Sequence, residues 1–268
     1  MPELPEVETV CRTLRPHLLG RRISDVDVRE PRLRWPIASD FAVGLRGRRI
    51  VDVRRRAKYI LVDLDDGRFW VVHLGMSGRL VVGDPPAELG HVHVLVALDD
   101  GSRVYYRDPR RFGMMRLARE ESDLGEVGVE PLGPRFTHGF LWDLRARHRR
   151  LTVKSLLMDA RRVAGIGNIY ANEALFEAGI RPTRRFGRVT RREMARLAIA
   201  VPSVLRRAID SGGSSLSDYR DAEGRLGAFQ KGFHVYDRLG EPCRSCGVAI
   251  RSRVISGRSS YYCPQCQR

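Results

Sequence analysis

Apolar residues recur at helical spacing near the start of the chain and then change to short strand-like runs. The helical spacing covers residues 3–19 and closes at Gly20, which predicts a helix that Pro16 kinks or shortens. Between residue 21 and about 118, turn-forming Asp-Gly and Pro-Pro pairs separate apolar runs at 59–64, 69–74, 93–98 and 103–108. This alternation predicts an antiparallel β-sandwich or barrel.

Helical periodicity returns in the second half of the chain, after a linker at 119–134 that contains proline and glycine. The predicted helices cover 138–148, 152–160, 168–178 and 190–210, the last with Thr190 as its N-cap. Residues 211–230 are small, polar and glycine-rich, and this composition predicts a long flexible loop. We therefore expect an α+β protein with domains at 1–132, 133–232 and 233–268.

Charge is distributed unevenly along the 268 residues. The chain has 48 basic and 32 acidic residues, a net charge of +16; residues 1–134 hold 22 basic and 21 acidic residues, and 135–268 hold 26 and 11. The strongly basic second half favours binding to a polyanion such as nucleic acid. The alternative is that the charge only keeps the protein soluble. The chain contains no run of 18 apolar residues, so no membrane span is predicted. Its N-terminal residues are acidic and do not have the basic and then apolar pattern of a secretory signal. We expect a cytoplasmic protein that does not bind membranes.

Lysine is rare among the basic residues, with only Lys58, Lys154 and Lys231 against 45 arginines. A lysine retained in such a chain is expected where a compact ammonium group is needed.

Four of the five cysteines form two Cys-x2-Cys pairs, Cys243 with Cys246 and Cys263 with Cys266. Sixteen residues separate the pairs, a spacing typical of a tetrahedral four-cysteine zinc site. A closed tetrahedron leaves no open position, so we expect one structural Zn²⁺ that stabilises a β-hairpin. The fifth cysteine, Cys11, lies on an apolar helix face and is expected in the core.

Several motifs together resemble the bacterial formamidopyrimidine-DNA glycosylases: PELPEVET (2–9), RRAKYILV (55–62), HLGMSGRL (73–80), DPRRFG (108–113), AGIGNIYANEALF (164–176), GEPCRSCG (240–247) and GRSSYYCPQCQ (257–267). The resemblance implies an N-terminal antiparallel β-sandwich with flanking helices, a helix–two-turns–helix domain with a lesion-capping loop at 211–230, and a C-terminal zinc finger. It also implies a monomeric base-excision-repair enzyme. Such an enzyme removes 8-oxoguanine and formamidopyrimidines from double-stranded DNA and then cleaves the backbone by β,δ-elimination.

The resemblance implies that Pro2 is the nucleophile, and removal of Met1 before a small residue would expose its amine. On composition alone, Pro2 would merely start a helix. Roughly a tenth of a terminal amine is neutral at pH 7, against under about a thousandth of a lysine. Attack at C1′ of a nucleotide displaces the base and leaves an iminium that favours strand elimination. The resemblance assigns Glu3 the acid/base role, Lys58 phosphate contact and proton donation, and Arg258 phosphate binding, where an arginine acts as an electrostatic clamp.

The resemblance further implies a set of DNA contacts. A flipped nucleotide leaves a gap in the duplex that Met76, Arg110 and Phe112 would fill. The remaining expected contacts are Glu6, His73, His91, Arg149, Lys154, Asn168 and Tyr236; Glu6 also has an ordinary explanation as an acid in the first turn of a helix. Three residues depart from the family pattern, namely Val92, Ala160 and Asp237.

Two other functions stay open at this stage. An endonuclease VIII-like glycosylase would prefer oxidised pyrimidines, although that branch generally begins PEGPE and lacks DPRRFG. A zinc-ribbon DNA-binding protein without catalysis would explain the charge and the cysteines, but would leave PELPE, Lys58 and DPRRFG as coincidences.

Overall fold

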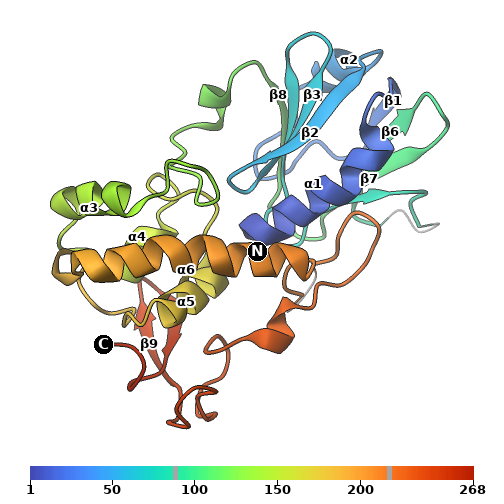
Figure 1. Ribbon diagram of the computed structural model, residues 1–268. Helices are drawn as coiled ribbons and strands as arrows, with labels where there is room; N and C mark the ends of the chain where they lie inside the picture. Colours follow the sequence, from blue (N-terminus) through green and yellow to red (C-terminus); the bar gives the residue numbers. More distant parts are fainter. Residues whose placement is uncertain (87–89, 216–218) are drawn as a thin grey trace. The chain divides into compact units, whose positions relative to one another are not determined.

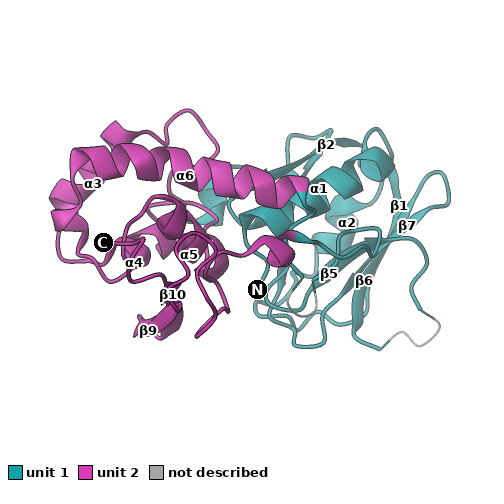
Figure 2. Cartoon of the chain, turned by 60° about the horizontal axis from the view of Figure 1, so that its bottom comes forward, with its two compact units in different colours: residues 1–125, 211–228 teal, residues 126–210, 229–268 magenta. Residues whose placement is uncertain are grey.

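The chain forms two compact units in the computed structural model, which describes residues 1–86, 90–215 and 219–268. Unit 1 contains residues 1–125 and 211–228, and unit 2 contains residues 126–210 and 229–268 (Figure 2). The segment after the long helix of unit 2 therefore returns to unit 1 before the chain enters the cysteine-rich end.

Unit 1 is the expected antiparallel β-sandwich. One sheet has the order β1-β6-β7-β5, and its strands are β1 (Ile23–Val28), β6 (Val92–Leu98), β7 (Arg103–Arg107) and β5 (Arg79–Val82). The other has the order β2-β3-β4-β8, with β2 (Ile50–Arg56), β3 (Tyr59–Leu64), β4 (Phe69–His73) and β8 (Met114–Ala118). The four predicted apolar runs match β3, β4, β6 and β7 to within one residue at each end.

Some strands of unit 1 carry an unbroken run of apolar residues that are buried in its core. The first four residues of β4 are all buried, and the Trp70 ring meets Phe41 of the short helix α2 (Phe41–Leu45) edge-on, with ring centroids 6.3 Å apart. Helix α1 (Leu4–Leu18) packs against β2 and β3 of one sheet and β5 of the other. Pro16 does not end this helix, because the fully buried Leu14 and Leu18 hold its last turn in the core.

Unit 2 is helical and ends in a two-stranded hairpin. Its helices are α3 (His138–Arg147), α4 (Val153–Met158), α5 (Asn168–Glu177) and α6 (Arg191–Asp210), and its hairpin joins β9 (Arg251–Ile255) to β10 (Arg258–Tyr262). Short 3₁₀ turns occur at Glu121–Leu124 in unit 1, and at Phe186–Arg188 and Phe229–Gly232 in unit 2. Helix α5 packs against α6, α4 and β10, and runs beside α6 in Figure 1.

Local hydrogen bonds set the ends of two unit 2 helices. Thr190 caps α6 as predicted, because its Oγ1 accepts from the Glu193 amide at 3.3 Å while Glu193 Oε2 accepts from the Thr190 amide at 2.8 Å. Helix α4 ends at Met158, earlier than predicted, since the Asp159 carboxylate accepts from the Arg161 amide and turns the chain. Within the described parts of the chain, no helix is both long and apolar enough to cross a bilayer.

Candidate functional site

The N-terminal turn of α1 fixes the residue that follows Pro2. Glu3 is the N-cap: its side chain accepts from the Glu6 amide, and Glu6 Oε2 accepts from the Glu3 amide at 2.8 Å. Pro2 is buried, and Glu3 and Glu6 are 4% and 2% exposed. Met1, bonded to the Pro2 nitrogen, is half exposed.

Glu6 links this turn to the segment 211–228. Its Oε1 accepts from the Ser214 amide at 2.8 Å, and its carbonyl oxygen accepts from the Tyr219 hydroxyl at 3.3 Å. Gly213 has φ +81°, and a Cβ there would lie 3.0 Å from Glu6 Oε1. Glu6 therefore does not fit the expected role of a direct DNA contact, because it is buried and both oxygens accept from backbone amides.

The described parts of this segment are packed on unit 1, although a flexible loop was predicted. The Ala222 amide donates to Thr13 Oγ1 at 3.2 Å, and the Ala222 carbonyl accepts from the Val82 amide at 2.9 Å. Tyr219 and Ala222 are buried in the core of unit 1, which explains the order. Residues 216–218 lie outside the described part of the chain, so the expected contacts of the capping loop with a lesion are not tested there.

Lys58 lies in the turn just before β3, and His73 is the last residue of the neighbouring strand β4. Lys58 is partly buried in the turn between β2 and β3, where Ala57 adopts φ +53°, and the next residue, Tyr59, pairs with His73 across β3 and β4. Burial, followed by the positive charges of Lys58 and Arg34, lowers the pKa of His73 to about 4. His73 Nδ1 accepts from the Gly75 amide at 3.1 Å, so the neutral ring carries its proton on Nε2 and can donate it.

The structure brings the three expected void-filling residues onto two touching loops. Met76 and Phe112 are 41% and 42% exposed, and the Arg110 guanidinium lies over the Phe112 ring, 4.7 Å from its centroid. A Cβ on Gly75 would lie 2.5 Å from the Phe112 carbonyl carbon, so the loops meet at this point. Large apolar side chains held out in solvent beside a cation are suited to entering a base stack.

Two residues near these loops add to the same surface. His91, an expected DNA contact, is exposed at φ +65°, and its carbonyl oxygen accepts from the Asp108 amide at 3.0 Å. Sequence reasoning did not select Arg34, whose amide donates to the Gly113 carbonyl at 3.2 Å and whose guanidinium stacks on the 55%-exposed Trp35. The adjacent basic and aromatic residues in RLRWP were a signal, but exposure of the tryptophan was not readable from the pattern.

In unit 2, the start of α5 and the segment at 234–236 are held together by one buried carboxylate. Asn168 begins α5 after two glycines, and Tyr236 is partly buried. Glu173 accepts from the backbone amides of His234, Val235 and Tyr236 at 2.9–3.0 Å. Burial opposes ionisation, but hydrogen bonds from His234 and these amides outweigh it and lower the pKa of Glu173. Sequence reasoning missed this function of the last residue of NIYANE.

Lys154 is a correction to the expected DNA contacts. Its side chain is fully buried, and Nζ donates to the Ser259 carbonyl at 2.9 Å and to Ser260 Oγ at 2.6 Å. A fully buried ammonium cannot reach DNA directly, so Lys154 instead holds strand β10. Arg258, the first residue of that strand, and Arg149, after α3, are both exposed as expected of phosphate-binding residues.

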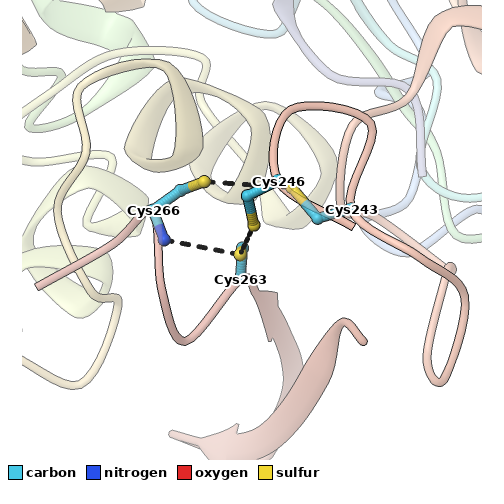
Figure 3. A group of neighbouring side chains, drawn as sticks. All are labelled: Cys243, Cys246, Cys263 and Cys266. Carbon is cyan, nitrogen blue, oxygen red and sulfur yellow. Dashed lines mark hydrogen bonds between the residues drawn. The ribbon is translucent and has the colours of Figure 1, made fainter. Parts of the chain in front are cut away.

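The four predicted zinc ligands converge in unit 2 (Figure 3). Their Sγ atoms all lie within 4.8 Å of one another; the Cys243 and Cys266 sulfurs are 3.9 Å apart, and those of Cys246 and Cys263 are 3.4 Å apart. Four thiolates at this separation fit a tetrahedral Zn²⁺ with bonds of about 2.3 Å. The set is closed, so the zinc is structural. The fifth cysteine, Cys11, is buried in the core as predicted.

Comparisons with known proteins cover almost the whole chain. Three family models match in order: the formamidopyrimidine-DNA glycosylase N-terminal domain at residues 1–115, its H2TH domain at 127–220, and a zinc finger found in FPG and IleRS at 240–268. The formamidopyrimidine-DNA glycosylase of Dinoroseobacter shibae is 46% identical over 285 residues, with all of both chains covered.

Two solved structures share this fold. MutM (FPG) from Thermus thermophilus has a TM-score of 0.88 at 39% identity, covering 99% of this chain and 98% of the other. Lactococcus lactis Fpg in complex with DNA containing an abasic site has a TM-score of 0.89 at 30% identity, covering 99% of both chains. The predicted resemblance, fold and zinc finger are thereby confirmed.

Proposed function

Because the chain belongs to the formamidopyrimidine-DNA glycosylase family, and is thus a base-excision-repair DNA glycosylase with AP lyase activity, we propose that its nucleophile is the amine of Pro2. The substrates are oxidised purines in double-stranded DNA, namely 8-oxoguanine and formamidopyrimidines. The supporting observation is the N-terminal turn of α1, where the capping hydrogen bonds fix Glu3 directly after Pro2.

The reaction begins when the lone pair of the neutral Pro2 nitrogen forms a bond to C1′. The bond from C1′ to the base breaks, its electron pair leaves with the base, and an acid supplies the proton that the base needs. The Pro2 nitrogen then gives up its proton, and the bond from C1′ to the ring oxygen breaks as that oxygen takes up a proton. The resulting iminium between Pro2 and C1′ withdraws electrons and acidifies C2′. Loss of the C2′ proton then expels the 3′ phosphate, and a second elimination expels the 5′ phosphate.

Glu3 is the proposed acid and base for these proton transfers. Glu3 is buried, with 4% of the residue exposed, and is adjacent in sequence to the nucleophile, where a carboxyl group can give and accept protons. Lys58 is the proposed phosphate contact and proton donor of the elimination step. Arg258 is the proposed phosphate clamp, because an exposed guanidinium binds phosphate well and releases protons poorly.

Met76, Arg110 and Phe112 are the proposed occupants of the gap left by the flipped nucleotide, with the two apolar wedges in the stack and the guanidinium at the unpaired base. We assign phosphate contacts to His73, His91, Arg149, Asn168 and Tyr236. His73 suits this role as a neutral donor, because its Nε2–H is the ring position that the Gly75 amide leaves available. The protein is proposed to act as a monomer in the cytoplasm, at the DNA.

Borohydride trapping followed by intact-mass measurement tests the nucleophile. A duplex containing 8-oxoguanine opposite cytosine should give one covalent adduct through Pro2, and Pro2→Gly should lower its yield strongly. An undiminished adduct in Pro2→Gly would contradict the assignment. Faster removal of thymine glycol than of 8-oxoguanine would favour the oxidised-pyrimidine alternative. Tight binding without turnover, by protein confirmed to start at Pro2, would favour a non-catalytic DNA-binding protein.

A further inference from the structure

Asp108 is a buried carboxylate at the centre of the loops that carry the void-filling residues. It is 0% exposed, and Oδ1 accepts from the Ser77 hydroxyl at 2.7 Å and from the Arg110 amide at 3.3 Å. Oδ2 accepts from the Tyr106 hydroxyl at 3.0 Å and from the Gly113 amide at 2.9 Å. One side chain therefore binds Ser77, the residue after Met76, and the amides of Arg110 and Gly113, which lie before and after Phe112 in the sequence.

The backbone of Asp108 extends the same network. Its carbonyl oxygen accepts from His93 Nε2 at 2.8 Å and from the Arg111 amide at 3.1 Å, and its amide donates to the His91 carbonyl. Arg111 has φ +54°, a conformation that non-glycine residues rarely adopt. This local bend lets the amides of residues 110 and 113 turn back toward one carboxylate.

The fit around the carboxylate is close. A Cβ on Gly113 would lie 1.7 Å from the Tyr106 hydroxyl, and a Cβ on Gly78 would lie 2.4 Å from the same oxygen. Among the residues that the structure describes, no arginine or lysine lies within ion-pair distance of Asp108, so its donors are hydroxyls and amides. A buried acceptor with four converging donors fixes geometry more than it adds net stability.

We propose that Asp108 is a positioning residue, which holds the loops of Met76, Arg110 and Phe112 in the one arrangement that can fill an opened base stack. This proposal rests on the proposed function of those three residues. Asp108 itself contacts no DNA, because it is fully buried. Because a gap needs filling only when a nucleotide leaves a duplex, replacing Asp108 should affect duplex substrates and not single-stranded ones.

Asp108→Asn tests the proposal with a minimal change of shape. The amide group brings two N–H donors, and hydroxyls can reverse to accept from it, whereas backbone amides cannot. The new side chain is expected to keep its oxygen toward Gly113 and Tyr106 and to turn its NH₂ toward Ser77, which leaves the Arg110 amide without an acceptor. The Arg110 amide is only partly buried, so the loss of its hydrogen bond corresponds to roughly a 2- to 10-fold effect.

The experiment compares borohydride trapping and cleavage on two DNAs. One is a duplex with 8-oxoguanine opposite cytosine; the other is a single strand with a preformed abasic site, where no gap needs filling. We expect Asp108→Asn to lower the duplex-to-single-strand rate ratio by this factor. Equal losses on both DNAs, or an unchanged ratio, would overturn the proposal. If wild-type protein forms no adduct with either DNA, the proposed function itself is wrong.

A spectroscopic measurement separates positioning from general destabilisation. With 2-aminopurine opposite a stable abasic analogue, saturating wild-type protein should change the fluorescence as the wedge enters, and Asp108→Asn should reduce that amplitude. A wild-type amplitude at saturation would contradict the proposal.

Asp65→Asn, the same change on an exposed turn of unit 1, is the matched control. If Asp108→Asn does not fold, the double variant Ser77→Ala/Tyr106→Phe keeps the charge and should lower the same ratio.

Discussion

Replacing Lys154 with methionine separates a structural role from a DNA contact. Methionine has nearly the length of the lysine side chain but no hydrogen-bond donor. The change removes the hydrogen bonds from Nζ to the Ser259 carbonyl and Ser260 Oγ, while Ser260 Oγ keeps its own bond to the Arg258 carbonyl at 3.2 Å. We therefore expect the first residues of β10 to loosen without loss of the zinc site.

Two opposing effects set the size of the change. Hydrogen bonds to a charged group contribute about 1.5–3 kcal/mol each, and both are lost. Methionine also removes the cost of burying an ammonium, which offsets part of that loss. We expect a net loss of about 2 kcal/mol in the free energy that closes the hairpin, which corresponds to roughly a 30-fold fall in amide protection.

Hydrogen exchange at the β9 and β10 amides measures this loss directly. Lys231→Met, which removes an exposed lysine of the same unit, is the matched control and should leave protection unchanged. Strand cleavage should fall together with protection, because Arg258 begins β10. Wild-type protection in Lys154→Met, combined with a selective loss of 8-oxoguanine excision, would refute the reasoning and restore a direct contact with the lesion.

Three further predictions concern other parts of the molecule. The pKa of His73 is lowered to about 4 in the folded protein from an ordinary 6.5. Between these two pH values the unfolded chain binds a proton at His73 that the folded protein does not. The free energy of unfolding should therefore fall as the pH is lowered from 6.5 to 4, and this fall should be smaller in His73→Asn when both are measured by equilibrium unfolding. Gly113→Ala places a Cβ 1.7 Å from the Tyr106 hydroxyl, and we expect the rate of 8-oxoguanine excision to fall by at least about 10-fold in kinetic assays. Gly90→Ala, whose Cβ would meet no atom within 4 Å, is the control and should leave that rate unchanged. Chelation of Zn²⁺, or Cys263→Ser, should abolish amide protection in the hairpin, and added zinc should restore it only in the chelated protein.

Sequence pattern was sufficient for the elements whose burial is periodic or whose chemistry is local. The apolar run 59–64 became β3 with the same bounds, and Thr190 capped α6 through its neighbour Glu193. The zinc ligands were predictable because each pair needs only one tight turn. In all of these, the interactions that determine the structure lie within a few residues of one another or repeat at a fixed spacing.

The errors at Lys154 and in the segment 211–230 concern residues whose partners are distant in the sequence. The rarity of lysine correctly indicated a special position for Lys154, but its acceptors are more than 100 residues away. The composition of 211–230 indicated flexibility because its residues are small and polar. Its order in the described parts comes from Tyr219 and Ala222 in the core of unit 1, and from the Glu6 carboxylate 208 residues away from Ser214. No spacing rule reports such contacts.

Three buried polar side chains, those of Asp108, Glu173 and Lys154, position backbone segments and do not contact DNA themselves. Asp108 binds amides and hydroxyls, Glu173 binds three consecutive amides, and Lys154 binds a carbonyl and a hydroxyl. A charge that binds backbone groups fixes where a loop lies, because a backbone group cannot turn away as a side chain can. Phosphate binding, as proposed for the exposed Arg149 and Arg258, acts through long-range attraction, which tolerates small errors of placement. The proposed wedge between bases would not tolerate such errors, which is the physical reason for assigning a fully buried anchor, Asp108, to the loop that carries Phe112.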